Sequence, residues 1–515
     1  MTTRKSPSLR ALALAIACLT AACTAPLSPQ DSRALRTQAA GGDSIRVKSL
    51  AVTPEGMTLD IEASEAILAL TNPTSTPLSV RAHFDGTAPA SQRQVASLSK
   101  ETHAECGFKP YRKLKLPARP ALRTLEEPQA PRELKDAMPF VLATLDQTGT
   151  LPVPQATRLY DGKHCVIYLD DRDAEWLSPE EAEELGRKFD NETYPTLTAT
   201  FGAELPHPGD DFNYGQDRVI VLVTRELAGS LPNAAGMVDT LDFLHPALTA
   251  QYGVHSNYAK MIYLLPSASN LPAATMAHEF VHVLFAQHRL KTYGEHHGNG
   301  GTFGQDPSYY LDDQTLFSEL PMNEGLAELG KFIAGYSPEA TPVYADRIAK
   351  FLGNPQLYAF HQLHGPGGSN YGGMSLVNSF LYGRDAAFPR KFLTAEATAS
   401  EAISEALGQD FTAFYRDFTL ALALDGMSAQ VPSRYQIPMV DLHATYQKET
   451  SLVPLRGAND SNAPLVLTAP RPYGVRFTRV RFPSGKGKLT ISGSPELKAS
   501  VILLDPSRPQ GFVED

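Results

Sequence analysis

The segment Thr-Met-Ala-His-Glu-Phe-Val-His, residues 275–282, constrains the fold more than any other part of this chain. Together with the residues that follow it, it is apolar nearly all round a helix, which predicts a helix buried inside the protein. His278 and His282 are four residues apart, so both imidazoles project from one helix face and can bind a single zinc ion. Two histidines and Glu279 inside such a helix are costly unless something binds them. The segment therefore predicts a buried helix that carries two metal ligands.

Glu279 lies beside the two histidines and is the candidate catalytic acid/base. It can accept a proton from a metal-bound water, whose pKa the metal lowers from about 16 to near 7. A catalytic zinc site needs three protein ligands and an open position. The sequence offers two candidates for the third ligand, His288 and Glu324.

His288 follows His278 by ten residues, which is the outer spacing of the metzincin pattern His-Glu-x-x-His-x-x-Gly-x-x-His. That pattern requires a glycine where the helix breaks, because the last histidine has to turn back toward the metal. The corresponding position here is Phe285. We therefore expect His288 to lie near the end of the same helix and not to bind the metal.

Glu324 lies 42 residues after His282, in the segment Asn-Glu-Gly-Leu-Ala-Glu (323–328), and is the preferred third ligand. It begins a second helix, expected over residues 321–335, that faces the first. Glu328 follows one turn later on the same side. A carboxylate at that position can accept the free ring N–H of a zinc-bound histidine and fix its tautomer. The alternative is an exposed acidic helix.

Residues 275–282 and 323–328 together resemble the gluzincin zinc metallopeptidases, which have thermolysin-like folds and use two histidines and a distant glutamate as ligands. Three upstream segments are similar to the hyicolysin family in particular: 189–195 followed by Phe201-Gly202, the strand 217–223, and Ser256-Asn257 with Met261-Ile262-Tyr263. The resemblance covers residues 160 to 425. It departs from the family at Pro321-Met322, where such enzymes often have tryptophan with an aliphatic residue.

The order of the expected elements, strands with helices first and then mostly helices, is that of an α+β unit, with small β domains on either side. The resemblance implies a zincin-like catalytic domain, in which a strand-rich N-terminal lobe carries the active-site helix and the C-terminal lobe is mostly helical. It implies His278, His282 and Glu324 as zinc ligands and Glu279 as the catalytic acid/base. The family also has a tyrosine in a place comparable to Tyr371, which follows a glycine-rich turn. Its hydroxyl is a candidate donor to the oxyanion of peptide hydrolysis, and the alternative is a structural tyrosine.

The N-terminus resembles the export signal of a bacterial lipoprotein. Three cations precede an apolar run from Ala11 to Leu19, which suits a signal peptide but is too short to span a membrane as a mature helix. The run ends in Leu-Thr-Ala-Ala-Cys (19–23), which is similar to a lipobox. We therefore expect removal of residues 1–22, lipidation of Cys23, and a location in the bacterial cell envelope with a lipid anchor in the membrane. The alternative is an ordinary secretory signal and a secreted protein.

Composition limits the partners of the chain. The formal net charge is −10, and loss of the three N-terminal cations makes it −13, so a generic electrostatic grip on nucleic acid is not expected. A protein or peptide substrate is the expected partner. Of the four cysteines, Cys18 leaves with the signal and Cys23 carries lipid. Cys106 and Cys165 remain outside the cytoplasm and are expected to form a disulfide.

The rest of the chain divides by composition into five parts: a lipidated tether (23–44), a small β module (45–86), a Pro-rich basic linker (87–158), the catalytic domain (159–430) and a C-terminal β domain (431–515). In the last part, apolar residues from 475 to 491 suggest a hairpin across Pro483-Ser484-Gly485. The strand 260–265, just before the zinc helix, is placed to pair with an extended substrate backbone.

These features predict a zinc-dependent endopeptidase in which Glu279 takes a proton from the attacking water and returns it to the leaving amine. Two alternatives remain: a surface lipoprotein that binds a ligand and has a non-catalytic zinc site, and an exopeptidase that acts on short peptides. Glu279 argues against the first, and a purely structural zinc more often has four protein ligands. The strand 260–265 favours cleavage within chains over the second.

Overall fold

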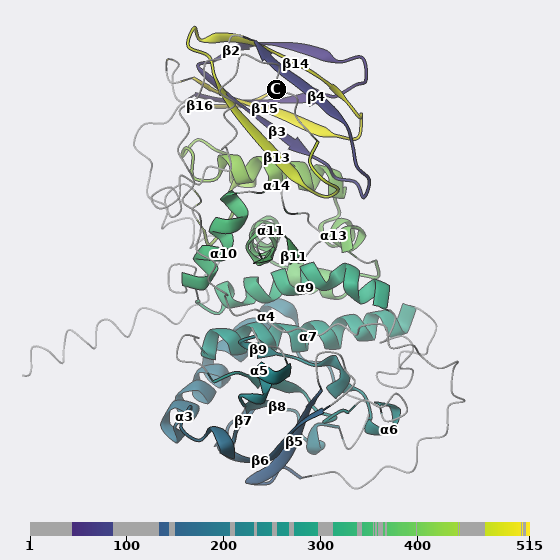
Figure 1. Cartoon of the computed structure of the whole chain (residues 1–515), viewed down its shortest axis with the longest axis vertical. Helices are drawn as coiled ribbons and strands as arrows, with labels where there is room; N and C mark the ends of the chain where they lie inside the picture. The colour runs from purple at the N-terminus through teal and green to yellow at the C-terminus, as the bar shows by residue number, and fades with distance from the viewer. Residues whose placement is uncertain are drawn as a thin grey trace, which may run out of the picture.

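The computed structural model of the chain has three layers along its long axis (Figure 1). A six-stranded sheet lies at one end, buried helices form the middle, and a β-sandwich lies at the other end. The fold is therefore mixed α+β, as the sequence predicts. The structure describes residues 44–85, 133–143, 150–206, 212–230, 234–249, 255–266, 272–296, 313–336, 342–353, 355, 358, 364–365, 368–397, 399–440, 442, 469–505, 507 and 511–515.

The six-stranded sheet has the strand order β5-β6-β7-β8-β10-β9. Its central strands β7, β8 and β10 are parallel and buried on both faces, so they are continuous apolar runs such as Val-Ile-Val-Leu-Val in β8. The other three strands run antiparallel to their neighbours. The bounds are β5 (Ala137–Ala143), β6 (Thr150–Asp161), β7 (Cys165–Asp170), β8 (Val219–Val223), β9 (Gly236–Met237) and β10 (Met261–Leu264).

β9 changes the role expected for β10. The sequence predicts that residues 260–265 are available to pair with a substrate, but β10 has β8 along one edge and β9 along the other. Tyr263 is opposite Met237, and Leu264 is opposite Gly236. The prediction for β10 is therefore wrong, and β9 is the terminal strand of the described sheet.

The linker predicted over residues 87–158 is wrong from residue 137 onward, because β5 and most of β6 lie there. Two prolines of this stretch, Pro152 and Pro154, lie inside β6. Pro152 is opposite Val141 of β5, Pro154 lies at the irregularity of that pairing, and the pairing of β6 with β7 starts only at Ala156. The missing proline N–H groups therefore cost no hydrogen bond toward β7. Residues 86–132 lie outside the described residues.

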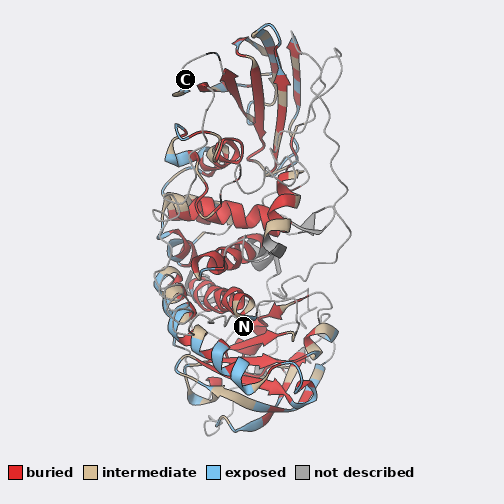
Figure 2. Ribbon diagram, turned by 90° about the vertical axis from the view of Figure 1, so that its left-hand side faces the viewer, coloured by how far each residue is buried: buried red, intermediate tan, exposed pale blue. Residues whose placement is uncertain are grey.

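Helices α7, α9 and α11 form a stack of buried helices between the sheet and the sandwich (Figures 1 and 2). α3 begins with a capping box, in which Ser178 and Glu181 each accept a hydrogen bond from the other's backbone N–H. The helix bounds are α3 (Pro179–Lys188), α4 (Tyr194–Phe201), α5 (Glu226–Ser230), α6 (Pro246–Thr249), α7 (Pro272–His296), α9 (Asp313–Ile333), α10 (Pro342–Gly353), α11 (Tyr371–Arg384), α12 (Phe388–Leu393), α13 (Ala399–Leu407) and α14 (Phe411–Leu424).

The helix predicted from residue 275 onward is confirmed as α7, and it is buried, with Phe280 and Val281 fully inaccessible to solvent. The second predicted helix starts earlier than expected. α9 begins at Asp313, and Pro321 lies inside it rather than at its start. No helix in the described part of the chain combines the length and apolar character needed to cross a membrane.

The sandwich packs a five-stranded sheet, β13-β3-β15-β1-β16, against a three-stranded sheet, β2-β14-β4. The predicted β module and C-terminal β domain are thus one unit, because strands from both parts of the chain alternate within each sheet. The predicted hairpin is also wrong, since β13 and β14 belong to different sheets. The bounds are β1 (Ser44–Ala51), β2 (Met57–Glu62), β3 (Glu65–Thr71), β4 (Val80–Asp85), β13 (Val475–Arg481), β14 (Lys486–Gly493), β15 (Lys498–Asp505) and β16 (Gly511–Glu514), and two short strands, β11 (His364–Gly365) and β12 (Gly368–Ser369), pair elsewhere.

Helix α14 joins the sandwich to the helical layer. It packs against β3, where the Thr71 hydroxyl donates to Thr419 at 2.8 Å. Apolar residues of the five-stranded sheet, such as Ile67 and Phe477, belong to the same core cluster as the buried helices. The sandwich is therefore an integral part of this fold rather than a module on a tether.

Candidate metal centre

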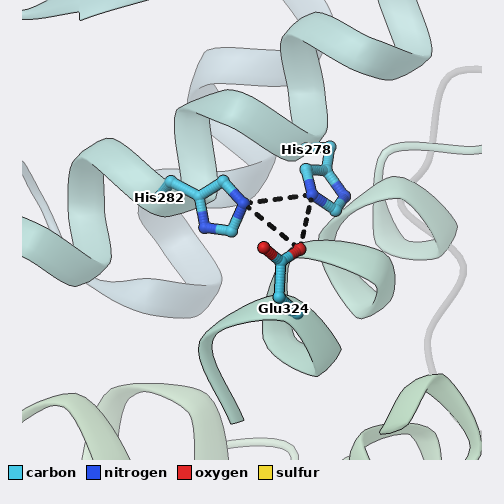
Figure 3. A group of neighbouring side chains, drawn as sticks. All are labelled: His278, His282 and Glu324. Carbon is cyan, nitrogen blue, oxygen red and sulfur yellow. Dashed lines mark hydrogen bonds and ion pairs between the residues drawn. The ribbon is translucent and has the colours of Figure 1, made fainter. Parts of the chain in front are cut away.

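Three buried side chains from two neighbouring helices converge on one point (Figure 3). His278 and His282 come from α7, and Glu324 comes from α9. The two Nε2 atoms are 3.1 Å apart, and Oε2 of Glu324 lies 3.3 Å from Nε2 of His278 and 3.6 Å from Nε2 of His282. Each residue offers one ligand atom, and these atoms lie within 4.8 Å of one another. The structure thus brings together the three residues that the sequence predicts as ligands.

Two glycines of α9, Gly325 and Gly330, let this helix approach its neighbours closely on both sides. A Cβ atom at Gly330 would overlap Val281 of α7, and one at Gly325 would overlap Asn378 of α11. Glycine is otherwise unfavourable inside a helix, by about 1 kcal/mol relative to alanine. The close packing of α7 against α9 is what places Glu324 beside the two histidines.

The buried atoms of this group fit a metal ion. Both carboxylate oxygens of Glu324 are buried and have no hydrogen-bond partner among the described residues. A buried carboxylate without compensation is costly, and a cation bound between Glu324 and the two imidazoles supplies that compensation. Two nitrogen ligands and one carboxylate oxygen form a set that accepts a divalent transition-metal ion and leaves a position open.

Glu328 lies where the sequence predicts it, beside His278. Its Oε1 atom is 3.4 Å from Nδ1 of His278, on the side of the ring that faces away from Glu324. The same oxygen accepts hydrogen bonds from Lys331 at 2.8 Å and from Arg347 at 3.0 Å. All of these side chains are at most 9% exposed. Glu328 therefore holds two buried cations next to His278, one of the predicted ligands.

Asn323, for which the sequence indicates no role, contacts the other predicted ligand, His282. Its Oδ1 atom lies 2.9 Å from Nδ1 of His282, and both residues are fully buried. An amide oxygen at this distance accepts the Nδ1–H and leaves the Nε2 lone pair for a metal. The signal was present in the sequence, since Asn323 directly precedes the ligand Glu324.

The two histidines have opposite electrostatic surroundings. Burial lowers the pKa of His278 well below its ordinary value, and the positive charges of Lys331 and Arg347 lower it further. Burial also acts to lower the pKa of His282, but the carboxylates of Glu324 and Glu279, together with the contact to Asn323, outweigh it, and the net shift is upward. His278 is thus held neutral, which is the form that binds a metal.

Glu279 is fully buried and is not one of the converging ligand residues. Its carboxylate faces the terminal strand of the sheet: a Cβ atom built at Gly236 of β9 would lie 2.7 Å from Oε1 of Glu279. The side chain of Glu279 therefore lies between its own helix, α7, and the terminal strand β9.

His288 lies in the same helix as His278 and His282, as the sequence predicts. It lies in α7 beyond the two ligands, its Nε2 atom is 2.9 Å from the carbonyl oxygen of Ala203, and it does not belong to the ligand group. Tyr371 is the first residue of α11 and is buried, with the Arg347 guanidinium 4.5 Å from its ring centre. Arg347 thus connects Tyr371 to Glu328.

Cys165 is a free and fully buried thiol in β7, and its expected disulfide partner Cys106 lies outside the described residues, so that disulfide stays a prediction. Its Sγ atom packs 4.0 Å from the carbonyl oxygen of Gly186 in α3, inside the core, and a partner cysteine would have to enter that core. Burial raises the pKa of this thiol well above its ordinary value. Cys106, Cys23 and the signal segment 1–22 lie outside the described residues.

A comparison of the chain with models of known protein families gives no match. A comparison with curated proteins also finds no similar sequence.

Proposed function

We propose that this protein is a zinc-dependent endopeptidase of the gluzincin type, with a zincin-like catalytic domain that resembles the hyicolysin family. The observation that carries the proposal is the buried group of His278, His282 and Glu324, with its ligand atoms within 4.8 Å of one another. Glu279, next to the first ligand along a helix, supplies the acid/base that such an enzyme requires. The ligand set of two histidines and a glutamate supports zinc as the metal.

Each residue of the centre has a separate task in this proposal. Zinc, when bound, supplies a Lewis acid that polarises the peptide carbonyl and lowers the pKa of water. Glu279 accepts the proton of the attacking water and returns it to the leaving amine. Asn323 and Glu328 hold the rings of His282 and His278 in orientation. Tyr371 is the proposed donor to the oxyanion.

The position of β9 supports an extended peptide as substrate. β9 is the terminal strand of the described sheet and lies directly beside Glu279. A peptide that adds to this edge as a further strand would bring a backbone carbonyl near the acid/base. Pairing along a strand needs no chain terminus, which favours an endopeptidase over an exopeptidase.

We also propose that the protein is exported and anchored to a bacterial membrane through lipid on Cys23. The support is the sequence alone, namely the apolar run 11–19 and the lipobox-like segment 19–23. Metabolic labelling with a fatty acid tests it. Incorporation that is lost in Cys23→Ser is expected, and a labelled Cys23→Ser variant or an unlabelled wild type contradicts the anchor.

The decisive experiment combines metal analysis of the purified protein with a casein-type assay on the wild type and on Glu279→Gln. We expect about one equivalent of zinc in both proteins and loss of activity in the variant. Glu401→Gln is the matched control, because Glu401 lies exposed on α13. Glu324→Ala should lose zinc, and full retention would contradict the choice of third ligand.

Zinc without activity on any protein or peptide favours the alternative function, a surface lipoprotein that binds a ligand and has a non-catalytic metal site. Activity on short peptides alone favours an exopeptidase.

A further inference from the structure

Strand β9 presents its two residues to opposite faces of the sheet. Met237 packs in the core on one face, together with Met261 and Tyr263. Gly236 is opposite Leu264, and residues directly opposite in an antiparallel pair point to the same face. Leu264 packs in the core that includes α7. The side-chain position of Gly236 is therefore directed at the helix that carries the metal ligands.

A side chain at position 236 has no room on this face. A Cβ atom there would lie 2.7 Å from Oε1 of Glu279, 2.8 Å from its Cγ and 2.7 Å from Cγ2 of Thr275. Contacts of this length are shorter than real Cβ atoms make, so something must shift. The ligands His278, His282 and Glu324 are not among the three nearest atoms.

Space, and not backbone conformation, requires glycine at this position. Gly236 is not among the described glycines with positive φ, so another residue could adopt its backbone angles without strain. Glu279 has a flexible side chain of two methylenes, which makes it the group that would move.

We infer that Gly236 is a positioning residue for Glu279: the bare backbone of β9 fixes where the carboxylate of Glu279 lies relative to the metal ligands. This inference rests on the proposed function for its catalytic consequence. The contact itself does not, because it is a property of packing between β9 and α7.

The contact can be tested without any enzymatic activity by a double-mutant cycle on stability. Gly236→Ala should lower the midpoint of thermal unfolding by a few degrees in the wild-type background. The same substitution should cost clearly less in Glu279→Ala, which removes the overlapping carboxylate, and less again when Thr275→Ser is added. Gly353→Ala is the control, because a Cβ atom at the end of α10 meets nothing within 4 Å. Equal losses in all backgrounds overturn the inference.

The catalytic consequence is tested by kinetics and metal content on the same variants. Gly236→Ala should keep its zinc and lower kcat by about 100-fold, because a displacement of about 1 Å in a reacting group costs that much. In the Glu279→Asp background, where the carboxylate is one methylene shorter, the loss on adding Gly236→Ala should be several-fold smaller. An increase in KM with unchanged kcat would mean that the alanine blocks substrate, and loss of zinc would mean that it disturbs the ligands; both contradict the positioning role.

The two proposals fail in different ways. A wild type without activity, together with the expected coupling in stability, removes the endopeptidase function and keeps the contact between Gly236 and Glu279. An active wild type whose Gly236→Ala variant has unchanged kcat keeps the function and removes the positioning role.

Discussion

Replacing Glu328 with glutamine would remove the negative charge that forms ion pairs with two buried cations, Lys331 and Arg347. Glu328 is 2% exposed. Its Oε1 atom accepts hydrogen bonds from Lys331 and Arg347 and also faces Nδ1 of His278. Glutamine has nearly the same shape and retains an oxygen that can accept a hydrogen bond. The substitution Glu328→Gln therefore isolates the effect of the charge.

Two consequences of Glu328→Gln have sizes that can be estimated. Removing one partner from a buried ion pair costs about 3–5 kcal/mol, because the remaining charge stays buried without compensation. We expect about 3 kcal/mol for the metal-free protein, since the amide oxygen still accepts one hydrogen bond. Metal affinity should fall by about 10- to 100-fold, because the carboxylate no longer orients His278. The lost negative charge near the ion acts in the same direction.

Denaturant unfolding with and without zinc measures both effects. The variant should lose stability without zinc, and zinc should restore less stability than in the wild type, by about 1.4–2.8 kcal/mol at saturation. Asp346→Asn is the control, because Asp346 forms a partly exposed pair with Lys350 on α10, and such pairs contribute at most about 1 kcal/mol. If Glu328→Gln binds zinc with wild-type affinity, Glu328 does not support His278.

Three further predictions concern groups outside the ligands. Burial, with the nearby carboxylate of Asp239, raises the pKa of Asp242 to about 8. The folded state then binds this proton more tightly than the unfolded state, so the contribution of Asp242 to the free energy of unfolding falls as pH rises from about 4 to about 8. The Asp242→Asn variant should lose this decrease in the free energy of unfolding between about pH 5 and about pH 9. The same decrease with pH in the variant and the wild type would contradict the prediction. Glu514→Gln should lower the free energy of unfolding by about 1 kcal/mol, because the carboxylate accepts the Tyr435 hydroxyl and pairs with two arginines, and no change in denaturant unfolding would argue against this. His288→Gln should keep the metal content of the wild type in elemental analysis, because its ring contacts a backbone carbonyl, and loss of metal would contradict the ligand set.

The centre was predictable from the sequence where its geometry lies within one helix. The spacing of His278 and His282 places both rings on one face of α7, and the spacing of Glu324 and Glu328 does the same for α9. Physical chemistry of a single helix is enough for such pairs, because four residues make about one turn. The contact between the two helices was inferred only from the resemblance to a family.

The β structure was less predictable because its pairing is not local. β3 pairs with β13 through Thr71 and Val475, which lie about four hundred residues apart, and nothing in either segment specifies that register. Pro483-Ser484-Gly485 is a turn, as predicted, but it passes from one sheet of the sandwich to the other instead of closing a hairpin. Turn residues indicate where a chain reverses, and packing of the whole domain decides which strands then pair.

Asn323 and Gly236 had no assigned role in the sequence for a similar reason. Each acts on a side chain from a distant part of the chain, and neither belongs to a periodic pattern. Both are small or polar residues at a contact between two elements: Asn323 of α9 against α7, and Gly236 of β9 against α7. The spacing within α7 places the reactive side chains on the helix, while residues on the elements packed against α7 fix the orientation of those side chains. The precision of the proposed centre therefore depends on the packing of α9 and β9 on α7, and substitutions at those contacts should alter its function without touching a ligand.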